Sequence, residues 1–594
     1  MTDSNNKQLG YVTSVFPNKV KIEVEDLIAF KRSIDDALGD LKIGSYLEIS
    51  DNDGCKLIAI IESYQIELKE RIVEDNQGHK TKETYPAYIL EANPLGTIIG
   101  DEFTRGGDAL TIPPKGAKPA SESDIKLIYE NGFKPHEKFL FATLAQDKNI
   151  EVPVNGNKFF NKHFSIVGSS GSGKSHTTAK ILQKAVSEKK EGGFEGLNNS
   201  HIVIFDIHNE YQAAFPGTNL LDINSLVLPY WLLNSEELND LFIESNESNS
   251  HNQVSQFQFA VTENKKRHNP LVISDKVYFD SPLKFDIKEV IQYIKNLNNE
   301  VIGRLEGEGK PKKSDNTLIN NRVDSYFTEE IDFCEQSTAK ASKASPGPYK
   351  GDFERFILRL ENTVGNKRFN FLFDDKTLEL KDVLENLLSY KSDKKSNVTV
   401  IDLSGIPFEV LSITVSLITR LLFDFGYFYK KYLNDAVDLE TPLLLVYEEA
   451  HKYVPKDNLA KFRASRNAIE RIAKEGRKYG VTLGIVSQRP SEISETIFSQ
   501  CNNFIAMRLT NPNDQNYVKR LLPDTLGSLI DSLPSLQSGE GLLLGEAIVM
   551  PSLVKIDQCD KDKEPSSNDV RYLDIWKEKW KDSDFESIIK EWKK

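Results

Sequence analysis

A glycine-rich octapeptide in the first third of the chain has the residue types of a phosphate-binding loop. It reads Gly168-Ser169-Ser170-Gly171-Ser172-Gly173-Lys174-Ser175, which fits the pattern G-x-x-x-x-G-K-[ST]. In such a loop the glycines let main-chain N–H groups approach phosphate oxygens, and the following helix directs its positive dipole end to the same place. Lys174 is expected to reach the β- and γ-phosphates, and the Ser175 hydroxyl to hold Mg²⁺. The sequence therefore predicts a site for ATP and Mg²⁺ that includes Gly168 to His176.

The residues on either side of this loop predict the strand and helix that the motif requires. Residues 164–167 are a short apolar run before the loop, and apolar residues between 181 and 186 fall on one face of a helix after it. A glycine-rich turn without a ligand is the alternative interpretation. The presence of Lys174 and Ser175, between a predicted strand and a predicted helix, argues against that alternative.

Hydrolysis also needs carboxylates, and a distant stretch offers two of them. The apolar run Leu443–Tyr447 is followed directly by Glu448 and Glu449. Because parallel sheets place ligands at the carboxyl ends of their strands, these acids are expected beside the phosphate loop. We predict that Glu448 is a ligand near Mg²⁺ and that Glu449 is the general base that polarises the attacking water. A pair of surface acids at a strand end is the alternative.

Two further positions are candidates for catalysis. Gln488 follows the next apolar strand and is predicted to sense the γ-phosphate or the attacking water, with an ordinary strand-end cap as the alternative. Arg477 is predicted to be an arginine finger that acts on the nucleotide of a neighbouring subunit, because a delocalised cation stabilises charge in the transition state. The competing candidates are Arg471, Arg489 and Arg508, and for each of them a surface salt bridge is the alternative.

Composition limits the class of protein. The 594 residues are too many for one core, and 39% hydrophobic with 28% charged residues suits a soluble globular protein. Four well-separated cysteines without a C-x-x-C pair argue against a zinc site and for a reducing cytoplasm. The polar first residues predict no signal peptide, and Arg420 and Asp424 make 410–428 a predicted buried helix rather than a membrane span. With a net charge of −14, nucleic-acid contact would need a local basic surface.

Residues 1–115 are predicted to form a small N-terminal β-barrel. Residues 19–25 alternate strictly between apolar and charged, as a half-buried strand does. Further predicted strands cover 46–49, 56–61, 66–73 and 88–90. The composition of 113–119 is that of a linker.

The rest of the chain predicts an α/β ATPase core with an insertion. Continuous apolar runs in 120–224 and 396–560 suit a parallel sheet buried on both faces. The more polar residues 225–395 are predicted to form a helical insertion carried by that core. Within it, Asn234 and Glu237 resemble a capping box that opens a helix. Residues 561–594 are predicted to be a C-terminal helical tail.

Together these motifs resemble those of HerA-type hexameric ATPases, within the HerA–FtsK group of ring translocases. The resemblance rests on Val167 to Ser175, Asp206-Ile207-His208-Asn209-Glu210-Tyr211, Leu228-Pro229-Tyr230-Trp231-Leu232-Leu233, Glu448-Glu449-Ala450-His451, Glu475-Gly476-Arg477-Lys478-Tyr479-Gly480, Ser487-Gln488-Arg489-Pro490 and Arg508-Leu509-Thr510-Asn511-Pro512-Asn513-Asp514. It implies an N-terminal β-barrel, a RecA-like P-loop core with a helical insertion, and a six-membered ring around double-stranded DNA. It also implies that Asp206, His208 and Glu210 sit near the nucleotide.

Two positions depart from the family pattern. Many relatives carry Asp where this chain has Glu448, so the carboxylate sits one methylene further out and the expected Mg²⁺ geometry changes. Asn209 stands where glycine is usual. Because Asn tolerates a left-handed backbone, we expect little consequence there.

The resemblance also implies partners. Members of the family usually work beside a separate effector, such as a nuclease or a sirtuin-like NAD-consuming enzyme in anti-phage complexes. The leading interpretation is a cytoplasmic homo-hexamer, without a membrane partner, that hydrolyses ATP and translocates double-stranded DNA in antiviral defence or DNA-end processing. The alternative is a nucleotide-gated assembly platform for an effector, without translocation. A conjugation or secretion motor that moves another polymer is a weaker third reading.

Overall fold

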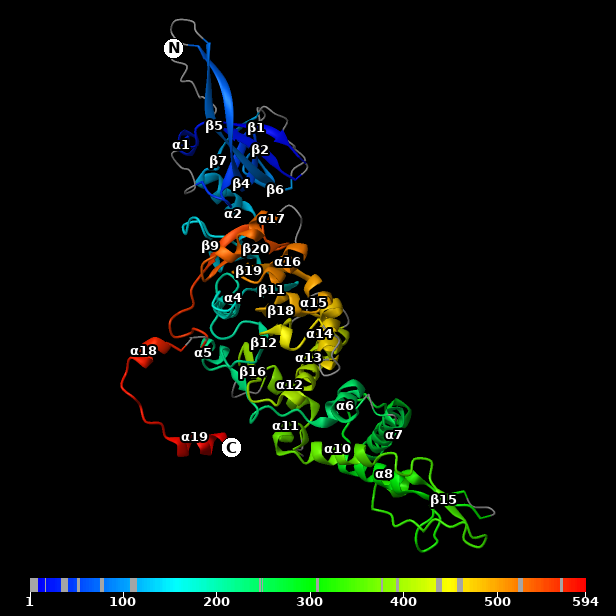
Figure 1. Ribbon diagram of the computed structural model, residues 1–594. Coiled ribbons are helices and arrows are strands. Elements are labelled where there is room, and N and C mark those ends of the chain that lie inside the picture. The colour runs from blue at the N-terminus through cyan, green and yellow to red at the C-terminus, as the bar shows by residue number, and fades with distance from the viewer. Residues whose placement is uncertain are drawn as a thin grey trace.

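The computed structural model describes residues 9–16, 18–33, 41–50, 54–74, 80–106, 115–244, 247, 249–305, 309–374, 378–390, 395–433, 441–456, 463–521, 527–566 and 570–593. Figure 1 shows an elongated chain with a β-domain at one end, a sheet-based core in the middle and a group of helices at the other end. No helix among these residues is both long enough and apolar enough to cross a lipid bilayer.

The N-terminal domain is a closed barrel. Its strands run in the order β2-β1-β7-β3-β4-β5, and β5 pairs back with β2 to close the circle. The elements are β1 (Gly10–Val15), β2 (Val20–Val24), α1 (Leu27–Lys31), β3 (Tyr46–Ser50), β4 (Cys55–Glu74), β5 (Lys80–Ile99), β6 (Glu102–Arg105) and β7 (Gly116–Pro119). Val20, Ile22 and Val24 are buried in the barrel interior, as the alternation of apolar and charged residues predicted. The predicted barrel is thereby confirmed.

Two details of the barrel differ from the sequence prediction. The separate strands predicted over 56–61 and 66–73 are one strand, β4, because β5 pairs with it along its whole length. The predicted linker contains β7, which pairs with β1 and with β3. A short strand that contains Gly and ends at Pro has the composition of a linker, and only its pairing reveals the strand. Pro113 and Pro114 lie outside the described residues.

The core is built on a ten-stranded sheet in the order β13-β16-β12-β17-β18-β11-β19-β20-β21-β9. Neighbours from β13 to β19 are parallel, and the remaining pairs are antiparallel. The strands are β9 (Ala142–Leu144), β11 (His163–Val167), β12 (His201–Asp206), β13 (Asn219–Leu221), β16 (Val398–Asp402), β17 (Leu443–Tyr447), β18 (Val481–Ser487), β19 (Cys501–Met507), β20 (Glu540–Gly545) and β21 (Ser552–Ile556). The separate short pair is β8 (Lys138–Phe139) with β10 (Val154–Asn155).

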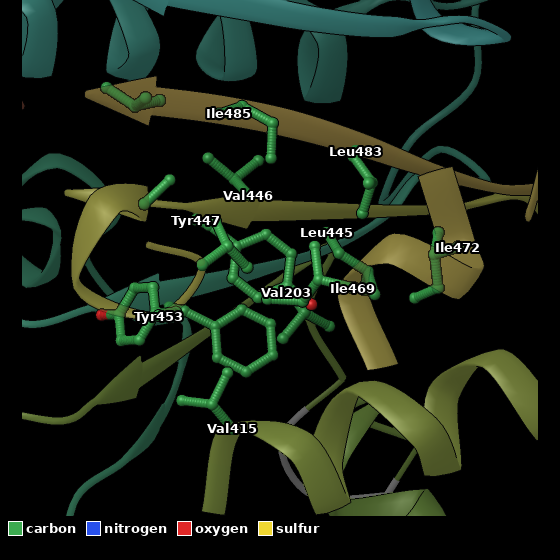
Figure 2. Close-up of a cluster of buried hydrophobic side chains, with 14 of the residues drawn as sticks. Val203, Val415, Leu445, Val446, Tyr447, Tyr453, Ile469, Ile472, Leu483 and Ile485 are labelled. Carbon is green, nitrogen blue, oxygen red and sulfur yellow. The ribbon is translucent and has the colours of Figure 1, made fainter. Parts of the chain in front are cut away.

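Every residue of β11, β17 and β18 is buried, as their continuous apolar runs predicted. Figure 2 shows Val415 of α13 and Ile469 and Ile472 of α14 packed near side chains of the sheet. The core helices are α2 (Glu122–Asn131), α3 (Gly156–Phe160), α4 (Lys174–Ser187), α5 (Tyr211–Ala214), α13 (Phe408–Tyr432), α14 (Arg463–Glu475), α15 (Glu495–Ser499), α16 (Pro512–Leu521) and α17 (Gly527–Asp531). The sheet is therefore a rigid frame whose strand ends can hold chemical groups in place.

Between β13 and β16 the chain forms a mainly helical body. Its elements are α6 (Ser235–Phe242), α7 (Ser250–His268), α8 (Ile287–Asn299), β14 (Val301–Gly303), α9 (Arg322–Tyr326), β15 (Ala344–Pro346), α10 (Glu354–Val364), α11 (Asn370–Phe373) and α12 (Leu380–Leu387). Asn234 caps α6, and the Glu237 side chain accepts from its main-chain N–H in return, which confirms the predicted capping box.

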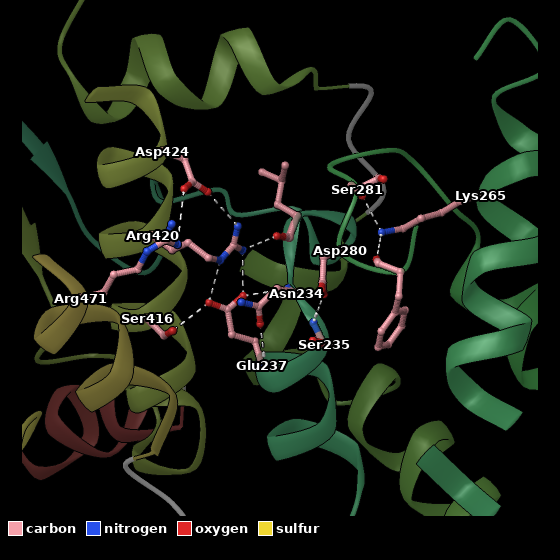
Figure 3. Close-up of polar contacts among 12 residues, drawn as sticks. Asn234, Ser235, Glu237, Lys265, Asp280, Ser281, Ser416, Arg420, Asp424 and Arg471 are labelled. Atoms are coloured by element: carbon pink, nitrogen blue, oxygen red, sulfur yellow. Dashed lines mark hydrogen bonds and ion pairs between the residues drawn. The ribbon is translucent and has the colours of Figure 1, made fainter. Parts of the chain in front are cut away.

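An ion pair fastens this helical body to the core. In Figure 3 the Arg420 guanidinium of α13 faces Glu237 of α6, with Nη2 2.9 Å from Oε2. Arg420 Nη2 also donates to the carbonyl oxygen of Leu232, and Ser416 donates to the other Glu237 oxygen at 2.8 Å. Removing one partner of such a buried pair leaves an uncompensated charge. Arg420 thus acts inside the protein, and the helix that contains 410–428 is largely buried, as predicted.

The C-terminal segment consists of α18 (Tyr572–Trp576) and α19 (Phe585–Trp592). The predicted helical tail is interrupted between them, so Trp580 lies outside any helix. Its side chain is 94% exposed.

Candidate nucleotide-binding site

The loop between β11 and α4 has the backbone of a phosphate cradle. Gly171 and Gly173 have φ angles of +69° and +101°, which glycine adopts without the strain of a Cβ. Gly173 caps α4, which begins at Lys174. Within the described residues, the N–H groups of Gly171, Gly173, Lys174, Ser175 and His176 donate no hydrogen bond to the protein. Free amides at a helix N-terminus are the donors that a phosphate needs, so these residues fit a bound nucleotide.

Neighbouring strand ends hold this loop in place. The Ser169 N–H donates to the carbonyl oxygen of Arg508, directly after β19, at 2.7 Å. A Cβ at Gly168 would lie 2.5 Å from Ser172 Oγ and 2.9 Å from Met507 Cβ. The first glycine of the motif is therefore required by close packing as well as by the turn.

The Lys174 ammonium group is buried close to three carboxylates. Among the residues that the structure describes, its side chain donates a single hydrogen bond, 3.4 Å long, to the Ser169 carbonyl oxygen. Burial lowers the pKa of Lys174, and the charges of Glu449, Glu448 and Glu210 oppose that shift. Lys174 and Glu449 are therefore close in the folded chain, although 275 positions separate them in the numbering of the sequence. A triphosphate would give Lys174 the strong anionic partner that the described residues do not provide.

Glu449 is held by Gln488, which directly follows the neighbouring strand β18, and by His451 of its own turn. It is 2% exposed and has a φ angle of +48°, which is uncommon for a residue with a side chain. The Gln488 main-chain N–H donates to Glu449 Oε2 at 3.3 Å, and the Gln488 side-chain amide donates to Oε1. His451 Nδ1 lies 3.2 Å from Oε2 and 3.1 Å from Ser487 Oγ. These contacts orient the Glu449 carboxylate at the strand ends beside the phosphate loop.

Glu448 has a different environment. It is 2% exposed, and Tyr211 donates its hydroxyl hydrogen to Glu448 Oε2 at 2.8 Å. Burial, and next the charge of Glu449, raise the pKa of Glu448 to about 8. A divalent cation nearby would favour the ionised carboxylate, and Ser175 is the second residue of α4, directly after the phosphate loop.

The oxygen atoms near Glu448 fit a Mg²⁺ ion that is bound partly by the protein and partly by the phosphates of the nucleotide. Glu210 Oε2 is buried and has no hydrogen-bond partner among the described residues. The same residues contain no group of three or more His, Cys, Asp or Glu that is arranged for a metal ion. Mg²⁺ is commonly held by one or two protein oxygens plus phosphates and water, so Ser175 and Glu448 are sufficient candidates.

The segment after β12 lies beside these groups. Asp206 Oδ2 accepts from the Tyr211 N–H at 2.8 Å, and Oδ1 accepts from the His208 N–H at 3.2 Å. Asn209 has a φ angle of +55°, so it adopts the left-handed backbone expected of the usual glycine. The Glu210 charge acts on Lys174. The Asp206 carboxylate thus organises a turn that brings Glu210 and Tyr211 to the site.

The candidate arginines lie in separate places. Arg477 is exposed and precedes β18, at the end of the sheet opposite to the phosphate loop of its own chain. Arg508 Nη2 donates to the Gly171 carbonyl oxygen at 3.3 Å, so it lies beside its own loop. Arg471 stacks on Phe423, with 4.5 Å between the guanidinium carbon and the ring centre. Arg489 pairs with the nearby Glu492 at 2.8 Å.

Sequence reasoning gave no role to two side chains that contact the predicted acids. Tyr211 contacts Glu448, and His451 contacts Glu449. The spacing of His451, two residues after Glu449 in a turn, was a signal for that contact. Tyr211 had no comparable signal. It follows β12, which is the neighbour of β17 in the sheet but lies far from Glu448 in the sequence.

Fold and site together define a P-loop ATPase with a RecA-like core. Residues 141–422 match the family described as Helicase HerA, central domain. The chain is 27% identical over 456 residues to the DNA double-strand break repair helicase HerA of Saccharolobus solfataricus, covering 76% of this chain and 74% of that protein. It is 25% identical over 556 residues to a probable helicase of Methanocaldococcus jannaschii, covering 90% of each. Residues 141–422 therefore carry the central domain of HerA-type helicases, and the chain is similar to curated HerA helicases over most of its length.

Solved structures of related shape were also found. VirB4 of Thermoanaerobacter pseudethanolicus aligns with a TM-score of 0.43 at 13% identity, over 72% of this chain and 99% of that one. The bacterial conjugative coupling protein TrwB aligns with a TM-score of 0.42 at 10% identity, over 75% of this chain and 92% of that one.

Proposed function

We propose that this protein is a ring-forming motor that hydrolyses ATP and translocates double-stranded DNA. The observation that carries the proposal is the convergence of Lys174, Glu448 and Glu449 at the carboxyl ends of β11 and β17. A phosphate loop alone binds nucleotide, whereas the buried acids beside it supply what hydrolysis needs. The relatives named as DNA double-strand break repair helicases support DNA as the polymer.

The residues have distinct roles in this proposal. The free amides of Gly171, Gly173, Lys174, Ser175 and His176, together with the Lys174 ammonium group, hold the phosphates and neutralise charge on the leaving group. Glu449 orients and deprotonates the attacking water, and Gln488 keeps the carboxylate in position. Ser175 and Glu448 would hold Mg²⁺, which would help to neutralise the charge of the phosphates.

Arg477 supports a multimeric ring. Because it lies at the opposite end of the sheet from its own phosphate loop, it can complete only the site of another subunit. We propose a homo-hexamer in which Arg477 acts as the trans finger. Mixing inactive Lys174→Ala subunits with inactive Arg477→Ala subunits should restore ATP hydrolysis, because mixed interfaces pair an intact loop with an intact finger. No recovery at any ratio would contradict the assignment of Arg477.

The motor itself is tested by the response of its ATPase rate to DNA. Double-stranded DNA should raise the rate at low salt, and the stimulation should fall as salt rises, because phosphate contacts release counterions. Displacement of streptavidin from the end of a biotinylated duplex would then report translocation. A basal rate that DNA leaves unchanged at low salt would overturn the proposal.

We further propose that the ring works with a separate effector, a nuclease or an NAD-consuming enzyme, in antiviral defence or DNA-end processing. The resemblance of the motifs to such ATPases supports this partnership. The second candidate function, a nucleotide-gated platform for that effector, is favoured by the barrel at the end of the chain away from the helical body. Co-purification identifies the partner. An effector that is equally active with wild-type and Lys174→Ala protein would exclude nucleotide gating.

A further inference from the structure

A second cavity lies behind the phosphate-loop helix, at the end of α4 away from the nucleotide site. Its volume is about 600 Å³, and its walls come from the second half of α4, the turn after α5, the start of β16 and residues 560–563. Lys184 on its wall follows Lys174 by ten positions in the same helix, which is about 15 Å along the axis at a rise of 1.5 Å per residue. The cavity is therefore separate from the predicted triphosphate site.

The charged side chains of this cavity are almost all cationic. Four lysines and one acid line it, namely Lys180, Lys184, Lys395, Lys563 and Asp560. Among the residues that the structure describes, none of the four ammonium groups takes part in an ion pair. Lys180 and Lys184 are four residues apart on one helix, where like charges face each other and repel. The chain as a whole has a net charge of −14, so this cluster of lysines is a local basic site that favours binding of an anion.

The remaining wall is apolar and well supported. Phe215 and Val398 line the cavity and are 6% and 2% exposed. Gln183 Nε2 donates to the carbonyl oxygens of Ala214 and Lys563, at 3.0 and 2.8 Å. Gln183 thus ties two walls of the cavity to α4. A site with an apolar side and several cations suits an organic anion that carries phosphate groups, and the volume lies within the usual range for small-molecule sites.

We propose that this cavity binds a free nucleotide or a similar organic polyphosphate, as a second site distinct from the phosphate loop. The lysines contact the phosphates, and the apolar wall around Phe215 receives the organic part. The ligand shares α4 with the catalytic site. It also contacts the segment that leads to Ser566, whose N–H donates to the Glu210 carbonyl oxygen at 2.8 Å. The cavity is therefore linked to the proposed catalytic site indirectly, through α4 and through residues 563–566.

The test is a binding titration of the full-length protein with a non-hydrolysable ATP analogue. Wild-type protein should bind two molecules per chain and Lys174→Ala protein one. Adding Lys184→Glu and Lys395→Glu to the Lys174→Ala protein should weaken the remaining site at least tenfold. Lys288→Glu, at an exposed position on α8, is the matched control and should leave it unchanged. A melting temperature equal to that of the parent confirms folding of each variant.

Two competition measurements identify the kind of ligand. Inorganic tripolyphosphate should compete for the remaining site, and competition should weaken with salt because exposed charges are screened. A 5′-phosphorylated oligonucleotide that displaces the analogue more effectively than free nucleotide does would overturn the assignment in favour of a nucleic-acid end. A single site in wild-type protein, or a remaining site unaffected by charge reversal, would show that the lysines only complement the C-terminal dipole of α4. DNA-stimulated hydrolysis is measured separately, so either result leaves the motor proposal to its own test.

Discussion

The phosphate loop and the Glu448–Glu449 turn belong to one site but are built in opposite ways. The loop uses main-chain amides, and its shape depends on glycines with positive φ angles in one short segment. The turn uses side chains, and each carboxylate is held by a residue that follows another strand of the sheet, Tyr211 after β12 for Glu448 and Gln488 after β18 for Glu449. A local motif can therefore be found from sequence, whereas a site made of side-chain contacts needs the fold.

The largest expected effect is at the loop lysine. Lys174→Ala should lower kcat/KM for ATP by at least about a thousandfold, because the γ-phosphate loses its buried cation in both the bound and the transition state. Steady-state phosphate release measures this loss. Lys158→Ala, at an exposed lysine before β11, is the control that should retain wild-type activity. Substantial turnover in Lys174→Ala protein would mean that the loop does not bind the triphosphate.

A substitution at Glu449 should impair hydrolysis without impairing nucleotide binding. Glu449→Gln should lower kcat about a hundredfold to ten-thousandfold, since it removes the general base but keeps the shape of the side chain. Nucleotide affinity should change little, because the loop amides remain. Comparing equilibrium binding with single-turnover hydrolysis separates the two effects. Equal loss of binding and hydrolysis would place Glu449 in phosphate binding instead.

A smaller effect is expected at His451. His451→Ala should reduce kcat about tenfold, because Glu449 loses one orienting contact while both contacts from Gln488 remain. Burial lowers the pKa of His451, so its imidazole is neutral near pH 7 and acts by position. His451→Asn should recover part of the rate by restoring a hydrogen-bonding group. Identical rates for both variants would remove the positioning role.

The smallest effect should appear at Tyr211 as a shift in pH dependence. The Tyr211 hydroxyl stabilises ionised Glu448 and so lowers a pKa that burial has raised. In Tyr211→Phe that pKa rises further, and the ionised form needs a higher pH. The acidic limb of the kcat profile should therefore move to higher pH, with about a threefold lower rate at neutral pH for a lost hydrogen bond. Saturating Mg²⁺ should reverse much of the shift, because the cation favours the carboxylate.

The barrel illustrates another limit of sequence reasoning. Strict alternation predicted β2 correctly, because one face of that strand is buried and the other is half-buried and carries charged side chains. β7 was mistaken for a linker, since four residues with Gly and Pro carry no periodic pattern. Its strand character comes from pairing with β1 and β3, which lie far away in sequence.

The sequence by itself determined the phosphate loop, the buried parallel strands and the pair of acids at the end of one of them. These features are local, since backbone conformation, strand burial and helix start depend on a few consecutive residues. Only the tertiary structure decided which side chains orient the acids, where Arg477 lies relative to its own loop, and that lysines from three segments surround a second cavity. Such features arise when distant strands and loops converge, and neither spacing nor composition records that convergence.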